Sequence, residues 1–244
     1  MTSAPPLRVS ALVTTFDQAR YLGEALECVL AQTEPPFEVV VVDDGSTDET
    51  PRVLESFGNH VRSHRQRNQG ISAARNRALK MARGNAVAFL DGDDLWPNRS
   101  LEVRVKALEG DPSAGGVAGW VEQFVSPALG SEEDQKVEGA QEVEPPGGGP
   151  RFGRLAGSML LRKGVFDAVG PFDTELEIGE TVDWLARADA AGIRLLSVPE
   201  VVLRRRIHGE NTVLKTENAG AGYLKVLRAA VERRRAGDRR EGQG

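Results

Sequence analysis

Hydrophobic and polar positions in the first hundred residues follow two alternating patterns. Short apolar runs rich in β-forming residues occupy 9–16, 38–42 and 86–90. Such runs suit strands that are buried on both faces of a parallel sheet. Apolar residues recur at helical spacing over 19–32, 71–83 and 98–109. The alternation predicts an α/β fold with a doubly wound, mostly parallel sheet flanked by helices.

The sequence after residue 112 is less regular. We predict extended segments at 115–125 and 193–203, and helices at 181–191 and 222–235. The stretch 126–150 is acidic and then rich in Gly and Pro, with almost no apolar side chains, which predicts a long mobile loop. The 244 residues fit one domain. We divide it into a first half at 1–112, a second half at 113–215, and a helix with a basic tail at 216–244.

Composition narrows the class of protein. The net charge of -5 argues against a nucleic-acid-binding surface, which has to be basic. The single cysteine, Cys28, cannot form an internal disulfide, which fits a reducing compartment. No signal pattern opens the chain, and no apolar run reaches the ~18–20 residues that span a bilayer. We expect a cytoplasmic protein without a transmembrane segment. Peripheral contact of the basic tail with a membrane stays open.

Acidic and hydroxyl side chains gather where three predicted strands end. The clusters are residues 14–17 (T-T-F-D), Asp43-Asp44 and Asp91-Gly92-Asp93-Asp94. Ligands of open α/β sheets bind beyond the carboxyl ends of the strands, so we expect the clusters to face one cleft. Mg²⁺ and Mn²⁺ prefer oxygen ligands, often carboxylates together with substrate phosphates. Asp91 and Asp93 are therefore candidate metal ligands, and an ordinary acidic turn is the alternative.

Further candidates for ligand binding lie on the same side of the predicted sheet. One carboxylate of Asp43 and Asp44 could bind a nucleobase or ribose, while the other caps a helix that begins at Ser46. Gly70 marks a junction between a loop and a helix. Arg75, on that helix, could bind a phosphate or a sugar, and a surface arginine without a ligand is the equally weighted alternative.

Three stretches of the first hundred residues together resemble the inverting glycosyltransferase family 2, whose members have the GT-A fold. They are residues 9–33, beginning V-S-A-L-V-T-T-F-D, residues 38–47, E-V-V-V-V-D-D-G-S-T, and residues 68–94, from N-Q-G to F-L-D-G-D-D. Motif order and spacing both agree with the family. The resemblance implies a single GT-A-type domain that transfers a sugar from a nucleotide-diphosphate sugar, expected to be UDP-linked, to an unidentified acceptor with inversion.

The same resemblance implies roles for individual residues. Asp91 and Asp93 correspond to the family's DXD pair, and Asp93 is the position that usually holds Mn²⁺ or Mg²⁺, which neutralises the leaving diphosphate. The residues assigned to the nucleotide-sugar site are Thr14, Thr15, Phe16, Asp43, Asp44, Gly70, Arg75, Asp91, Asp93 and Arg206. The family's usual Pro-x-Tyr-Asn is replaced at residues 14–17, so that Phe16 keeps a stacking face without the hydroxyl.

The expected catalytic base is the main departure from the family. An inverting transferase needs a general base near the acceptor, usually a carboxylate. The family's base is the Asp of a Glu-Asp pair, and this chain has Thr181 at that position. Glu180 and Asp183 lie beside it. We favour Asp183, which would lie in the first turn of the predicted helix, with Glu180 second and helix capping as the alternative for both.

The last motif is R-R-R-I-H-G-E-N at residues 204–211. In the resembling enzymes, a His at this place contacts the metal or diphosphate and is followed after three positions by Asn, as His208 and Asn211 are here. An imidazole can complete a metal shell, and Arg205 or Arg206 can neutralise a diphosphate. His208 is therefore the third candidate metal ligand, with Asp93 and Asp91.

Two classes of function follow from these motifs. The leading hypothesis is a metal-dependent glycosyltransferase. Because Thr181 replaces the expected base, the alternative hypothesis is a degenerate family member that binds a nucleotide sugar or glycan without turnover. A nucleotidyltransferase ranks low, since F-D-Q-A-R follows the first predicted strand in place of a phosphate-binding loop. A Rossmann dehydrogenase lacks its Gly-x-Gly-x-x-Gly motif.

Overall fold

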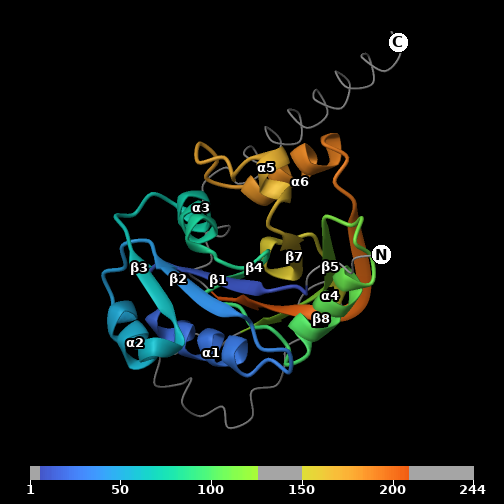
Figure 1. Ribbon diagram of the computed structural model, residues 1–244. Helices are drawn as coiled ribbons and strands as arrows, with labels where there is room; N and C mark the ends of the chain where they lie inside the picture. Colours follow the sequence, from blue (N-terminus) through green and yellow to red (C-terminus); the bar gives the residue numbers. More distant parts are fainter. Residues whose placement is uncertain (1–5, 126–149, 209–244) are drawn as a thin grey trace.

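The fold is built on one mixed sheet, shown in the computed structural model of Figure 1, which describes residues 6–125 and 150–208. Within this part the sheet has eight strands in the order β3-β2-β1-β4-β7-β5-β6, and β8 pairs with β5. The strands are β1 (Val9–Thr15), β2 (Glu38–Asp43), β3 (Arg62–Arg65), β4 (Ala86–Asp91), β5 (Gly116–Val125), β6 (Arg151–Phe152), β7 (Met159–Arg162) and β8 (Leu195–Ile207). Strands β1 to β4 are parallel, whereas β7 runs antiparallel to both β4 and β5.

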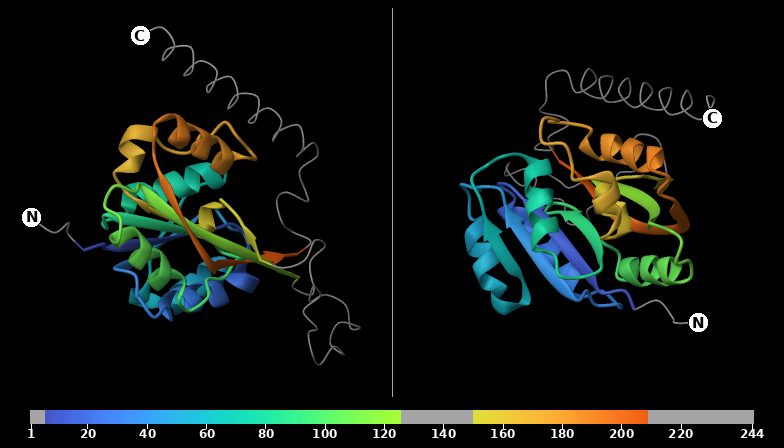
Figure 2. Two further views of the ribbon diagram at one scale, coloured as in Figure 1. Left: turned by 90° about the vertical axis from the view of Figure 1, so that its right-hand side faces the viewer. Right: turned by 45° about the horizontal axis from the view of Figure 1, so that its top comes forward.

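Helices cover both faces of the sheet, as the two views of Figure 2 show. They are α1 (Ala19–Leu30), α2 (Thr50–Ser56), α3 (Ile71–Met81), α4 (Ser100–Glu109), α5 (Val165–Val169) and α6 (Glu180–Ala190), with short 3-10 turns η1 (Gly58–His60) and η3 (Ala156–Ser158). Apolar residues of α1, α2 and α4 form one core layer with the sheet. Those of α3, α5 and α6 form the second layer on the opposite face. The predicted α/β class and single domain with a mostly parallel sheet are confirmed.

The β-branched runs make the strands because their side chains fill both core layers. All seven residues of β1 are buried, and Val40, Val41 and Val42 of β2 are completely buried. Side chains alternate between the two faces of a strand, so Val41 joins the layer of α1 while Val40 and Val42 join that of α3. Burial on both faces explains why these strands carry no polar alternation.

Two local predictions differ from the structure. The helix after β2 begins at Thr50, not at Ser46, because the Ser46 hydroxyl accepts a hydrogen bond from the backbone N–H of Asp17 (2.9 Å). Strand β3 was not predicted, since its sequence R-S-H-R contains no apolar residue. The predicted loop at 126–150 and helix at 222–235 fall almost entirely outside the described residues, as does Asn211.

Candidate active site

The carboxyl ends of β1, β2 and β4 lie side by side. In the sheet register Thr14 is the partner of both Val42 and Asp91, and Thr15 is the partner of Asp43. The Thr14 hydroxyl donates to Asp91 Oδ1 (3.3 Å). The three clusters predicted from the sequence therefore meet at one edge of the sheet.

Asp17 fixes the loop between β1 and α1. Its backbone has a positive φ of 50°, a conformation that Asp tolerates better than most residues. Its carboxylate accepts the backbone N–H groups of Thr47 (2.6 Å) and Asp48 (3.3 Å). The loops after β1 and β2 are thus joined, and the Phe16 side chain stays 44% exposed beside them.

Asp43 and Asp44 are both buried and both hold loop backbone. Asp43 Oδ1 accepts the N–H of Ser46 (2.8 Å). The Asp44 carboxylate accepts the N–H groups of Gln69 (3.0 Å) and Gly70 (2.7 Å). Gly70 itself has φ +87°, which side-chain-bearing residues rarely adopt. The two acids therefore tie the end of β2 to the start of α3, in addition to any contact with a ligand.

Gly92 allows the turn after β4 to approach the loop after β1. A Cβ atom at this position would lie 2.7 Å from Gln18 Oε1 and 3.0 Å from the Thr15 side chain. A side chain here would force Gln18 and Thr15 to shift, so glycine suits the tight turn between Asp91 and Asp93.

Arg75 connects the two halves of the chain. Its Nη2 donates to both oxygens of Asp91 (2.8 and 3.0 Å), and its Nη1 donates to Glu180 Oε1 (2.6 Å). Burial disfavours the charge on Arg75, but the neighbouring Asp91 and Glu180 carboxylates outweigh it and raise the pKa above its ordinary value. The alternative of a solvated surface arginine is wrong, since Arg75 is 4% exposed.

Replacing Arg75 with Met should destabilise the fold by about 3 kcal/mol, because Asp91 and Glu180 would face each other without a cation. This value is at the low end for such a change because the Asp91 side chain is 35% exposed. Urea unfolding followed by intrinsic fluorescence measures the difference. The matched Arg99→Met variant removes an exposed i,i+3 ion pair with Glu102 and should leave the unfolding midpoint unchanged. Equal stability of the Arg75 variant and the parent would contradict the bridging role.

Asp93 and His208 form the opposite side of the acidic turn. His208 Nε2 lies 2.9 Å from Asp93 Oδ2, and the imidazole packs on the Tyr21 ring with centroids 4.7 Å apart. Both Asp93 and His208 are buried. Of the three predicted metal ligands, the structure brings Asp93 and His208 together and directs Asp91 to Arg75. Among residues 6–125 and 150–208, no group of three His, Cys, Asp or Glu side chains is gathered around a common point.

Arg206 holds the acidic turn against β8. Its backbone N–H donates to Asp94 Oδ1 (2.9 Å), its Nε to the carbonyl of Asp93 (2.9 Å), and its Nη2 to Glu24 Oε2 (2.5 Å). Burial, followed by the charges of Asp93 and Asp91, raises the pKa of Asp94 well above its usual range. The acidic side chains of this turn thus lie close enough to disfavour one another's ionisation, and a bound cation would relieve that repulsion.

Glu180 and Asp183 occupy different surroundings although both lie in the first turn of α6. Glu180 shares Arg75 with Asp91 and also accepts the Thr181 hydroxyl (2.9 Å). Asp183 Oδ2 accepts a bond from Arg187 Nε (2.8 Å), and Arg187 in turn donates to the carbonyl of Val169. Glu180 is thus the acid that adjoins the Asp91 cluster, whereas Asp183 is engaged by its own helix.

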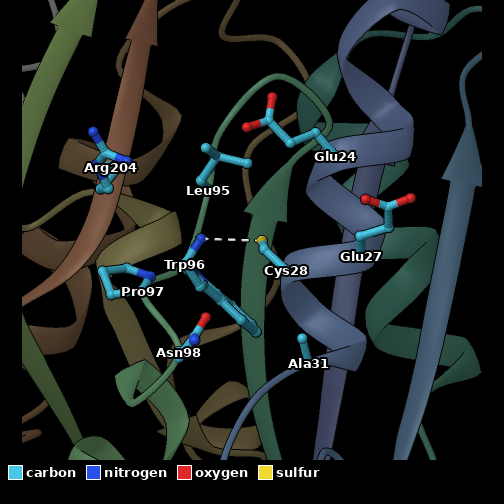
Figure 3. A pocket seen from close by; sticks show the side chains of 9 residues that line it. All are labelled: Glu24, Glu27, Cys28, Ala31, Leu95, Trp96, Pro97, Asn98 and Arg204. Atoms are coloured by element: carbon cyan, nitrogen blue, oxygen red, sulfur yellow. Dashed lines mark hydrogen bonds between the residues drawn. The ribbon is translucent and has the colours of Figure 1, made fainter. Parts of the chain in front are cut away.

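A separate pocket of about 340 Å³ lies between α1 and the segment that follows Asp94 (Figure 3). Glu24, Cys28, Trp96 and Arg204 are among its lining residues. The Cys28 sulfur accepts the backbone N–H of Trp96 (3.2 Å), and burial raises the thiol pKa to about 11. A thiol of this kind is largely protonated at neutral pH, which is typical of a structural cysteine.

Sequence reasoning missed three residues that shape the site. Tyr21 and Glu24 lie within the helix predicted at 19–32 without a role in the site, yet Tyr21 packs against His208 and Glu24 binds Arg206. Asp17 had been noted for its place in the first motif, without its role in joining two loops. The i,i+3 spacing of Tyr21 and Glu24 on α1 was the available signal, because residues so spaced share one helix face.

Solved glycosyltransferases share this fold. The S. aureus TarS fragment 1–349 in complex with UDP-GlcNAc has a TM-score of 0.70 at 22% identity, over 93% of this chain and 66% of that one. The mannosyltransferase PcManGT from Pyrobaculum calidifontis, in complex with GDP-Man and Mn²⁺, has a TM-score of 0.64 at 21% identity and the same coverage. The fold is therefore the GT-A fold of these enzymes.

The chain belongs to glycosyltransferase family 2, since residues 10–170 match that family. Glycosyltransferase AglE of Haloferax volcanii is 29% identical over 93% of this chain and 76% of its own length. An uncharacterised glycosyltransferase of Nostoc is 27% identical, at 93% and 73% coverage. The putative teichuronic acid biosynthesis glycosyltransferase TuaG of Bacillus subtilis is 37% identical, but over 44% of each chain. The family and enzyme class predicted from the motifs are confirmed. No helix in the described ranges is long and apolar enough to cross a membrane.

Proposed function

We propose that this enzyme transfers a sugar from a UDP-type nucleotide sugar to an acceptor hydroxyl, with a divalent metal and with inversion at the anomeric carbon. One observation carries the proposal. The paired acids after β4 stand between His208 on one side and the Arg75–Glu180 pair on the other. The complexes of TarS with UDP-GlcNAc and of PcManGT with GDP-Man and Mn²⁺ support it.

The residues present fit a metal ion. Asp93 and His208 offer an oxygen and a nitrogen ligand within 2.9 Å of each other, and burial together with the nearby Asp93 and Asp91 carboxylates raises the pKa of Asp94. Mg²⁺ and Mn²⁺ are commonly bound by one or two carboxylates, with substrate phosphates completing the shell. When bound, the metal would act as a Lewis acid that neutralises the leaving diphosphate.

The nucleotide is proposed to bind over the ends of β1 and β2. Phe16 offers an exposed ring for stacking on a base. Thr14 and Asp44 lie beside it at the strand ends, with Thr15, Asp43 and Gly70 supporting the same loops. Arg206, through its bonds to Asp93 and Asp94, would position the metal-binding turn, which refines the direct diphosphate contact expected from the sequence.

We propose Glu180 as the general base, in place of Asp183, which the sequence alone favours. Glu180 adjoins Asp91 through Arg75, whereas Asp183 is paired with Arg187. In the proposed step, the Glu180 carboxylate takes the proton of the acceptor hydroxyl as that oxygen attacks the anomeric carbon. The bond from this carbon to the diphosphate breaks, and the nucleoside diphosphate leaves. Attack on the face opposite the leaving group gives inversion.

A donor screen tests the proposal. UDP- and GDP-linked sugars are offered with Mn²⁺ or Mg²⁺, and binding is followed by thermal shift and turnover by release of nucleoside diphosphate. We expect one donor class to raise the melting temperature and to be turned over only with metal, with EDTA abolishing release. Metal-independent release at the full rate would overturn the metal role. Tight donor binding without turnover across many acceptors would instead favour the alternative hypothesis of a non-catalytic family member, which Thr181 suggests.

A further inference from the structure

Two aromatic side chains, Trp120 on β5 and Phe152 on β6, remain exposed where β5 runs on past its pairing with β7 and pairs with β6. Trp120 is 36% exposed and Phe152 is 42% exposed. They are direct partners in the antiparallel register, so their side chains stand next to each other on one face. The other two tryptophans, Trp96 and Trp184, are at most 2% exposed. An exposed aromatic pair on neighbouring strands is typical of a binding surface.

The register places this pair level with the candidate active site. Leu160 of β7 is the partner of both Ala88 on β4 and Val117 on β5. Since β4 and β5 run in the same direction, Asp91 and Trp120 each lie three residues further along. Figure 1 shows β7 between β4 and β5, so two strand spacings, about 10 Å, separate the two positions across the sheet.

Trp120 also points to the same face of the sheet as Asp91. Val121, its neighbour, joins the core layer of α1 and α4, and a Cβ at Gly119 would meet Val202 of that layer. Alternation therefore directs Trp120 to the opposite face. Leu90 likewise joins the α1 layer, while Asp91 contacts Arg75 of α3 on the other face. Trp120 and Phe152 thus extend the surface on which Glu180 lies.

We propose that Trp120 and Phe152 form an aromatic platform for a sugar ring of the acceptor, an inference that rests on the proposed transfer. Aromatic faces are electron-rich, and one face of a pyranose presents C–H groups that suit them. The platform lies on β5 and β6, across β4 from the nucleotide-binding ends of β1 and β2. A donor held at Asp91 and Asp93 leaves this side for the acceptor. Arg154, whose guanidinium lies 6.0 Å from the Phe152 ring, adds a donor for hydroxyl groups at the border.

Iodide quenching of tryptophan fluorescence tests the platform directly, because Trp120 is the accessible indole among the three in the chain. Methyl glycosides and disaccharides of glucose, mannose and N-acetylglucosamine serve as probes, without donor or metal. At least one sugar should protect Trp120 from iodide in a saturable manner. Phe152→Ala should weaken that binding about three- to tenfold, and Trp120→Phe supplies the background signal.

Phe37→Ala is the matched control, because Phe37 is 49% exposed next to the opposite end of β2, with Arg8 over its ring. It should leave sugar protection unchanged, and melting curves confirm that each variant is folded. An exposed aromatic pair also suits a lipid chain, so n-octyl phosphate is used to test a lipid ligand as the alternative. Protection by n-octyl phosphate alone, or by none of the sugars, would overturn the platform. Sugar protection without any nucleotide release in the donor screen would instead leave the platform intact and contradict the proposed function.

Discussion

Replacing Asp93 with Ala is expected to lower nucleotide-sugar turnover by about two to three orders of magnitude, the loss typical when a group that stabilises transition-state charge is removed. Asp93 is the acid whose oxygen lies 2.9 Å from His208, and we propose that both hold the metal. Release of nucleoside diphosphate from the donor found in the screen, at several Mn²⁺ concentrations, measures the effect.

The matched control is Asp167→Ala, at an exposed position of α5, which should retain full turnover. The melting temperature tests whether lost turnover of Asp93→Ala reflects unfolding. Arg206 holds this turn through hydrogen bonds to the Asp93 carbonyl and the Asp94 side chain. Neither contact requires the Asp93 carboxylate, so the variant should remain folded. Unchanged turnover at limiting metal would show that Asp93 does not serve the metal.

Glu180→Gln should lower the rate of sugar transfer by about 10²–10⁴-fold, the usual contribution of a general base. The amide keeps the size of the side chain and can still accept a bond from Arg75, but it cannot take a proton. Donor binding, read by thermal shift, should change little, since Glu180 lies on the α6 side of Arg75. Steady-state rates with a saturating sugar acceptor measure the loss.

Asp183→Asn is the comparison variant for the loss of transfer rate in Glu180→Gln. Asp183 is paired with Arg187 four residues along the helix, so we expect the amide to alter stability more than the transfer rate. A pH–rate profile separates the two candidates, because loss of the base removes the acidic limb of the profile. If Asp183→Asn abolishes transfer while Glu180→Gln keeps it, Asp183 and not Glu180 is the general base. Strong activation by Thr181→Asp would point to a decayed base at the family position.

The sequence predicted the parts of this molecule that depend on local pattern. Strands β1, β2 and β4 were predicted because residues buried on both faces must be apolar throughout. Strand β3 was missed because it is a sheet-edge strand whose side chains alternate between half-buried and exposed. The start of α2 was misplaced because Ser46 has a partner in another loop, at Asp17, which local capping rules do not include.

Contacts between distant segments account for what could not be predicted. Arg75 meets Glu180 across 105 positions, and Asp93 meets His208 across 115. Arg104 illustrates the limit further. It is completely buried, its Nε and Nη1 donate to the carbonyls of Ser100 and Met159, and burial lowers its pKa to about 9. An arginine at a helical position would ordinarily be assigned to solvent, and only the packing of η3 and β7 against α4 reveals otherwise.

The guanidinium of Arg75 restricts which halves of two related enzymes can be joined in a chimera. One side chain on α3 satisfies an acid of the donor-side turn and an acid of α6 at once. A chimera that joined residues 1–112 to the second half of another family member would therefore need a carboxylate at the position of Glu180. Without it, Arg75 would lose one of its two counterions in a buried site. Compatibility between the halves thus requires this three-residue charge balance as well as the apolar contacts around it.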